Sequence, residues 1–168
     1  MDEPLRPQRG GFLRPFGCGW FIREFLMGNG PMGSLAISPI EGAPQADIFY
    51  HYKNALLREI AVGRATAAEE RQARRQRRVI SPSAIENMAE KYRARLPYKS
   101  HGCRYHSFIV YFSNLKRLGW VEFTGKVEPS SMQSYGVGQP RRYYRLTTLG
   151  MAASNMAWAN PYAALYGG

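Results

Sequence analysis

The chain has 168 residues, with 23 lysines and arginines against 12 aspartates and glutamates, and a formal net charge of +11 at pH 7. This length suits one domain with an adequate core, and a hydrophobic content of 45% is typical of a globular protein and not of a disordered one. The basic excess favours a polyanionic partner or a membrane surface. No apolar run is long enough to cross a bilayer, so we expect no membrane partner. The two cysteines, Cys18 and Cys103, make no disulfide framework, which predicts a cytoplasmic protein.

The N-terminal part of the chain predicts an arm and a short core helix. Residues 1–16 mix proline, glycine and arginine without a period, which predicts a flexible basic arm. Such an arm either reaches along DNA or stays disordered at the chain end. Residues 20–27 are an apolar run that predicts a helix, and Gly28 to Pro31 stops it.

A helical, arginine-rich segment is predicted over about 47–80. Asp47 is a candidate N-cap, and Ile48, Tyr52 and Leu56 recur on one side of the helix. Residues 64–79 are polar nearly all round, and two interpretations remain open. They form either a solvated helix stabilised by charge pairs or a second phosphate-contacting element. In the second case the contacting side chains are Arg71, Arg74, Arg75 and Arg78.

Residues 83–118 predict two helices joined by a short connection. Ser83 and Glu86 match a capping box at the start of the first helix, and Leu96-Pro97 ends it. The second helix carries an apolar stripe that repeats at three- and four-residue steps, and Gly119 follows where a helix prefers a left-handed residue. The stripe consists of Phe108, Tyr111, Phe112, Leu115 and Leu118.

The rest of the chain predicts two strands, a further helix and a tail. Residues 120–124 and 141–146 are rich in strand-forming residues and flank a basic loop. Thr147 or Thr148 can cap a helix that extends to Trp158, and residues 159–168 form an apolar tail. The predicted class is mainly α with a small β-hairpin (α+β). Helix, strand, basic loop, strand and helix is the order of a winged helix-turn-helix, here assigned to residues 17–158 with additional helices.

The residues around the second strand also resemble a known family, the PadR type of transcriptional regulator. The resemblance covers LKRLGWVE at 115–122 and GQPRRYYRLTTLGMAA at 138–153. The string that closes the family's wing is formed here by Gly138, Pro140, Arg141, Arg142, Tyr143, Tyr144, Leu146, Thr147 and Gly150. The resemblance implies a winged helix that binds double-stranded DNA as a homodimer built by the helix after the wing. That helix is short in this chain, so the dimer could instead use the helix over 47–78 or the apolar tail.

The predicted DNA contacts lie on the second helix of the pair, about 101–118, and on the wing, 125–142. This helix would enter the major groove with its N-terminal end deepest. The candidates at its start are Lys99, Ser100, His101 and Arg104, and those on its outer face are His106, Ser113 and Arg117. In the wing, Lys126, Arg141 and Arg142 can meet phosphates or the adjoining minor groove. The predicted function is sequence-specific DNA binding as a transcriptional regulator, with no particular small-molecule effector indicated.

Other functions receive less support from the residues. Ile109 and Val110 on the outer helix face leave room for a protein contact, so a basic module that docks in a larger protein or nucleoprotein assembly is the first alternative. A nucleoid-type DNA binder without sequence preference is the second. The sequence contains no nucleophile elbow or phosphate-binding glycine loop, and we expect no enzyme and no cofactor. His101, Cys103 and His106 have metal-ligand chemistry, but Cys18 or His51 would have to complete the set, and we expect no metal.

Overall fold

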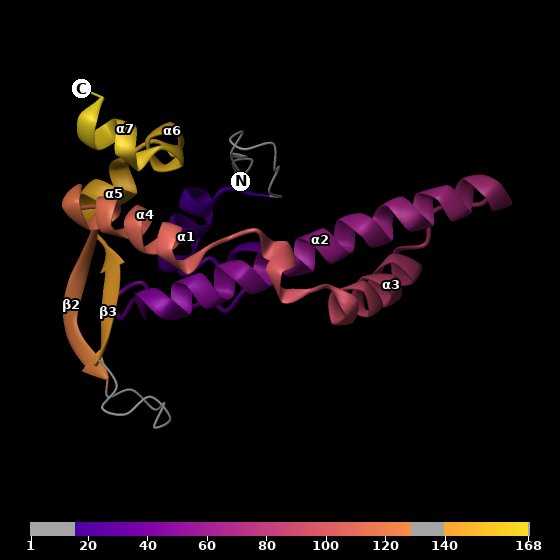
Figure 1. The fold of residues 1–168 in the computed structure, drawn as a ribbon, viewed down its shortest axis with the longest axis horizontal. Helices are drawn as coiled ribbons and strands as arrows, with labels where there is room; N and C mark the ends of the chain where they lie inside the picture. Colours follow the sequence, from indigo (N-terminus) through magenta and orange to yellow (C-terminus); the bar gives the residue numbers. More distant parts are fainter. Residues whose placement is uncertain (1–15, 129–139, 168) are drawn as a thin grey trace.

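The computed structural model describes residues 16–128 and 140–167. About 65% of these described residues are helical, and three strands among them form one antiparallel sheet, so the predicted α+β class is confirmed. The molecule is elongated (Figure 1): the sheet and several short helices gather at one end, and two long helices project from them. The projecting pair is called the hairpin below and consists of α2, Gln45–Gln76, and α3, Pro82–Arg95.

The first described residues belong to the core. Phe16 is completely buried, with its ring 5.7 Å from that of Phe21 and 5.7 Å from that of Tyr52. Phe16 therefore belongs to the core and not to the predicted arm. The other residues of that arm, 1–15, lie outside the described part of the chain. Helix α1 (Cys18–Leu26) follows, two residues earlier than predicted, and Gly28 ends the helical path with a φ of 84°.

Helix α2 is a single uninterrupted helix of 32 residues. It begins directly after the two-residue strand β1 (Ala43–Pro44), with Pro44 as its N-cap. Asp47 lies in the first turn and does not cap the helix, contrary to prediction. A rise of 1.5 Å per residue gives α2 a length of roughly 48 Å. The first half is packed into the core, whereas the second half leaves the body of the protein with α3.

Helix α3 begins two residues earlier than the predicted capping box implies, because Ser81 is its N-cap and not Ser83. The hydroxyl of Ser81 accepts a hydrogen bond from the Ala84 N–H at 3.3 Å. Pro82 occupies the first helical position, where the missing N–H costs nothing. The capping residue is thereby placed immediately before the proline.

The predicted pairing of the two helices over 83–118 is wrong. Both helices exist, but α3 packs along the second half of α2, whereas α4 (Tyr105–Arg117) packs on α2, β2 (Val121–Glu128) and the C-terminal helix. Leu96-Pro97 and a short 3-10 turn, η2 (Tyr98–His101), lead the chain from the hairpin back to the body. The apolar positions of α3 are therefore satisfied by α2 and not by the helix that follows it in sequence.

A buried carboxylate holds the turn of the hairpin. Glu69 on α2 is 1% exposed and accepts two hydrogen bonds from the Arg78 guanidinium, at 2.7 and 2.8 Å, and one from the Ser81 N–H at 2.7 Å. Ser81 is also the cap of α3, so one carboxylate fixes both the end of α2 and the start of α3. The hydrogen bonds from Arg78 and Ser81 lower the pKa of Glu69 from 4.5 to about 2.

Substituting Glu69 with glutamine is expected to loosen the hairpin and to remove an acid-dependent part of its stability. Because the folded pKa is depressed, the ionised carboxylate stabilises the fold above its unfolded pKa, and this contribution is lost as the pH falls from about 4.5 toward 2. The protection factors of the α3 amides, which compare the measured exchange with the intrinsic rate at each pH, should fall on acidification in the wild type. They should be lower in Glu69→Gln at neutral pH, and the difference between the two proteins should shrink as the pH approaches 2. Glu70→Gln is the control, because Glu70 is the exposed neighbour. Equal exchange in wild type and Glu69→Gln at neutral pH would contradict the prediction.

The sheet has the order β1-β3-β2, and both pairs of neighbours are antiparallel. Strand β2 pairs with β3 (Arg141–Leu146), and the register places Glu122 opposite Arg145. The second strand agrees with the prediction, whereas β2 extends further into the predicted loop. Strand β1 reaches β3 because Gly42, with a φ of 69°, precedes it, and a Cβ at this position would overlap the Tyr144 carbonyl oxygen. Residues 129–139 of the predicted wing lie outside the described chain.

The predicted apolar stripe of α4 faces the core. Phe108, Phe112 and Leu115 are buried, while Tyr111 and Leu118 are partly buried and pack against the same cluster. Gly119 follows the helix with a φ of 75°, as predicted. The stripe joins α4 to α1, to the first half of α2 and to the sheet.

The C-terminal segment forms three short helices, where one helix and a tail were predicted. They are α5 (Thr148–Ala152), α6 (Asn155–Ala159) and α7 (Pro161–Tyr166). Thr147 caps α5 as expected, and Ser154 caps α6 after the extended Ala153 interrupts the helical path. Trp158 is buried and its indole N–H donates to the Gly150 carbonyl at 2.9 Å. The residues predicted as an apolar tail thus include a helix, and α7 packs on α4.

Candidate nucleic-acid interface

The start of α4 is set by a turn that lies between the hairpin and the helix. Gly102 closes η2 in the left-handed region with a φ of 71°, and Arg104 is extended as the N-cap of α4. The helix therefore begins at Tyr105 and ends at Arg117, whereas about 101–118 was predicted. Lys99 and Arg104 are exposed in this turn, and Ser100 is half-buried. Both cations are therefore exposed on the turn directly before α4.

His101 was predicted to contact DNA, but it lies in the interior. Its side chain is 6% exposed, and its ring meets those of Phe49 and Tyr98 edge-on at 6.4 and 5.0 Å. The Nδ1 atom accepts a hydrogen bond from the Cys103 N–H at 2.9 Å. His101 therefore shapes the turn before α4, and this prediction is corrected.

The outer face of α4 carries both polar and apolar side chains. His106 and Arg117 are exposed on it, and Ser113 is half-buried. Ile109 and Val110 lie on the same face and are 40% and 50% exposed. At the C-terminal end of the helix the Arg117 guanidinium lies 5.5 Å from the Tyr166 ring of α7. This contact makes Arg117 a neighbour of the C-terminal helix, so the most open basic part of α4 is its start.

The three basic residues predicted for the wing differ in how far acids neutralise them. Arg141 forms an ion pair with Asp47 in the first turn of α2. Lys126 lies 3.9 Å from carboxylate oxygens of Glu41 and Glu128. Arg142 is exposed, lies 5.6 Å from the Phe123 ring and has no ion pair with any residue in the described ranges. Arg142 is thus the predicted wing residue whose charge is most available to a ligand.

One groove brings the start of α4 together with the end of β3 that follows the β2–β3 loop. It has a volume of about 440 Å³ and is lined by residues of β1, α2, α4 and β3. Tyr105 lines it from α4, Arg141 and Arg142 from β3, and Gln45 from α2. Its remaining lining residues are Pro44, Ala46, Pro140 and Tyr144. Guanidinium, amide and phenol groups therefore converge on a groove with no acidic lining residue, which we call the wing groove.

Tyr105 and Gln45 line the groove although neither was among the predicted contacts. Tyr105 is 44% exposed and its ring lies 5.0 Å from Phe49, and partial burial raises the pKa of its phenol. Gln45 opens α2 beside the groove. The place of Tyr105 directly after Arg104 was the available signal in the sequence, but its aromatic character suggested the core. The position of Gln45 depends on the pairing of β1 with β3, for which a two-residue strand gives no sequence signal.

The arginines of the hairpin lie apart from the wing groove. Arg71 is 26 residues beyond Gln45 on a continuous helix, a separation of roughly 39 Å along the axis. Arg71, Arg74 and Arg75 are exposed. The Arg78 guanidinium forms an ion pair with Glu69, so Arg78 is not the free phosphate contact that was predicted. The structure therefore does not assemble the two predicted basic regions into one site.

The wing groove has the chemistry of a binding surface for anionic and hydrogen-bond-accepting groups. Within residues 16–128 and 140–167, no cluster of three or more histidine, cysteine or acidic side chains is arranged to hold a metal ion. Across the same residues, no helix combines the length and apolar character needed to span a membrane. The guanidinium groups of Arg141 and Arg142 in the wing groove, in contrast, suit bidentate contact with phosphate or guanine.

Comparison of this chain with protein-family models, with curated proteins and with solved structures finds no match.

Proposed function

We propose that the protein is a cytoplasmic, sequence-specific DNA-binding protein of the winged helix-turn-helix type that regulates transcription as a homodimer. The observation that carries the proposal is the wing groove. It places the first turn of α4 beside the Arg142 side chain of the sheet and has no acidic lining residue. In a winged helix, the reading helix and the wing contact one duplex together, which requires this proximity.

The order of elements supports the same proposal. Helix α1, strand β1, the first half of α2, helix α4 and strands β2 and β3 succeed one another, and the sheet order β1-β3-β2 brings the first strand beside the last. The partner of α4 in the helix-turn-helix would then be the first half of α2, and the hairpin would be an insertion between the two helices. A row of buried residues from Ile48 to Leu56 joins that half of α2 to the core that α4 also enters.

The charges support a division of roles within the proposed contact. Arg104 precedes the first helical residue, so its side chain would reach the floor of a major groove entered by the start of α4. Lys99 stands beside it on the preceding turn and would meet the phosphate backbone. Arg142 would contact phosphates or the adjoining minor groove from the wing. Arg141, held by Asp47, would orient the wing against α2.

The test is a selection from a random duplex pool, followed by fluorescence-anisotropy titration of the enriched duplex and of a scrambled duplex at several salt concentrations. A regulator should prefer the enriched duplex by roughly a thousandfold or more. Equal and steeply salt-dependent affinity for both duplexes would indicate a nucleoid-type binder instead. No binding to either duplex at moderate salt would overturn the DNA-binding proposal.

A second candidate function has a specific observation in its favour. Ile109 and Val110 expose apolar surface on the outer face of α4, where a DNA-reading helix is usually polar. A module that docks in a larger protein or nucleoprotein assembly would use this face. Ile109→Asp separates the two functions, because it would abolish docking in a pull-down from the native host, while DNA affinity would fall only if α4 lies in the groove.

A further inference from the structure

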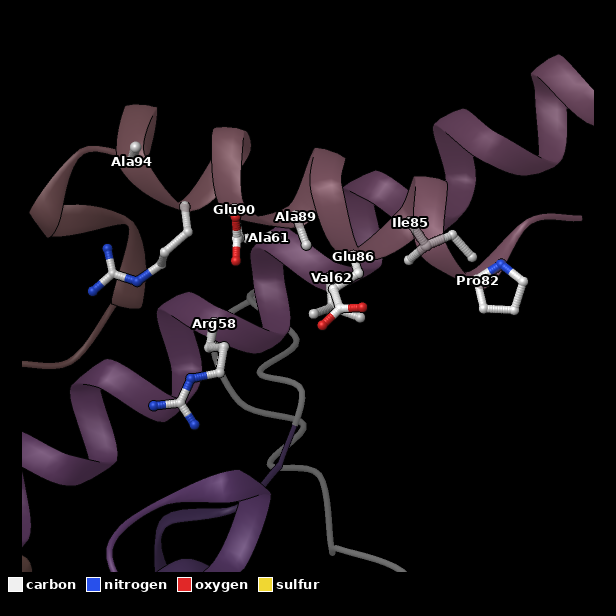
Figure 2. A pocket seen from close by; sticks show the side chains of 10 residues that line it. Arg58, Ala61, Val62, Pro82, Ile85, Glu86, Ala89, Glu90 and Ala94 are labelled. Atoms are coloured by element: carbon white, nitrogen blue, oxygen red, sulfur yellow. The ribbon is translucent and has the colours of Figure 1, made fainter.

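The hairpin carries a groove that the proposed DNA contact does not use. This hairpin groove lies between α2 and α3 and has a volume of about 640 Å³ (Figure 2). Its apolar lining includes Val62 from α2 and Ile85 and Ala89 from α3. Helix α3 has no buried residue, although one side of it is covered by α2. Apolar surface of this kind gains roughly 25 cal/mol for each Å² removed from water, which favours an occupant.

The charged residues of the hairpin groove are sorted along its length. Arg58 and Arg93 lie at the end near the body of the protein, whereas Glu86 lies toward the tip, near Pro82. Figure 2 shows this order, with Arg58 at one end, Pro82 at the other, and Glu90 and Glu86 between them. The two arginines and two glutamates balance in charge. Glu86 lies farthest from the arginines, whereas Glu90 lies only three residues from Arg93 on α3, so the acidic part extends from the middle of the groove toward the tip.

This arrangement is complementary to itself. When a second copy of the groove is turned by 180° and laid against the first, its basic end meets the acidic part of the first, and the reverse holds at the other end. A two-fold interface needs one patch that matches its own rotated image. A strongly charged partner of either sign, DNA included, is not expected here, because the lining is largely apolar and has no net charge.

We propose that the hairpin groove is the surface through which two copies of this chain associate, with their α2–α3 hairpins antiparallel and Arg58 and Arg93 of each copy facing Glu86 and Glu90 of the other. The inference rests on the proposed function only for the expectation of two copies, and it names the surface that joins them. Arg64, Arg71 and Arg75 are spaced by seven and four residues and share a side of α2 roughly opposite to Val62. They therefore stay available to solvent or DNA in the dimer.

A charge-exchange experiment tests both the surface and the antiparallel arrangement. One variant carries Glu86→Lys and Glu90→Lys, and the other carries Arg58→Glu and Arg93→Glu. Each alone has grooves of one sign and should be monomeric, with a mass of about 19.0 kDa in light scattering, whereas the wild type should show twice that mass. An equimolar mixture of the two variants should recover the dimer mass, because opposite signs then meet at both ends.

The controls keep the result independent of folding and of DNA. Circular dichroism checks that each variant keeps its helices, since Arg58 donates to the Met32 carbonyl and Arg93 to the Asn54 side chain. Val62→Glu provides a second test that leaves both arginines in place and should also give a monomer. Glu70→Lys, outside the groove lining, should remain dimeric.

Three results would overturn the inference. They are a monomeric wild type at roughly 100 μM, dimeric single-sign variants, or variants that fold as monomers and do not recover the dimer on mixing. A monomeric wild type would also overturn the homodimer of the proposed function, whereas DNA binding itself is measured separately by anisotropy, and a failure of DNA binding leaves the masses unchanged.

Discussion

Replacing Phe112 with alanine is expected to lower the free energy of unfolding by about 3–5 kcal/mol, because the ring is completely buried and its removal leaves a cavity. The Phe112 ring lies 6.0 Å from that of Phe108 and 5.3 Å from that of Tyr144 on β3. The Phe112 ring therefore packs α4 against the sheet that carries the wing. Thermal and denaturant unfolding followed by circular dichroism would measure the loss, which corresponds to a fall in Tm of roughly 10 °C.

The control for this substitution lies on the same helix. Ile109 is 40% exposed on the outer face, so Ile109→Ala should change stability by less than about 1 kcal/mol. If the two variants had similar stability, the inward direction of the α4 stripe would be wrong. In Phe112→Ala protein that remains folded at low temperature, the affinity for the enriched duplex should also fall, because the start of α4 and the wing would no longer be held in register.

The second large effect concerns Arg104 at the start of α4 and Arg142 in the wing groove. Arg104→Ala should weaken binding to the enriched duplex by about 1–3 kcal/mol and reduce the preference over scrambled duplex, because its proposed position at the start of the reading helix faces the bases. Arg142→Ala should weaken binding to both duplexes about equally and reduce the slope of log affinity against log salt by about one. Anisotropy titrations at four or more salt concentrations give both quantities.

Lys91→Ala is the matched control, because it also removes one positive charge, from an exposed position on α3 in the hairpin. It should leave affinity and specificity close to those of the wild type. Unchanged affinity in both Arg104→Ala and Arg142→Ala would place the DNA contact elsewhere on the protein. Equal loss of specificity in both variants would show that the proposed division between base and backbone contacts is wrong.

The parts of the fold that the sequence predicted are those set by local periodicity and capping. The spacing of Phe108, Phe112 and Leu115 determines an apolar stripe whatever the helix packs against, and Gly119 after Leu118 supplies a left-handed end. Thr147 caps the next helix for an equally local reason. Such signals depend on a few neighbouring residues, so they survive without knowledge of the rest of the chain.

The errors share a different physical origin, because each depends on contacts between distant residues. The spacing of the apolar residues in α3 predicts that the helix has an apolar side. It does not show that this side packs against α2 and not against α4. The burial of His101 depends on Phe49, which belongs to another helix. The engagement of Arg78 depends on a tight turn that returns the guanidinium to Glu69. The wing groove likewise depends on the pairing of β1 with β3, which only the folded chain provides.

The direct junction between β1 and α2 has a mechanical consequence. Pro44 is both the last residue of the strand and the N-cap of the helix, so no flexible linker separates the sheet from a rod of roughly 48 Å. Because the first half of α2 is packed into the core, the free arm is its second half, roughly 24 Å long, and a rotation of the whole helix by about 5° moves the far end by about 2 Å relative to the point where the helix leaves the body. Gln45 at the start of the same helix lines the wing groove, so a force on the hairpin would be transmitted toward the groove where the nucleic acid is proposed to bind.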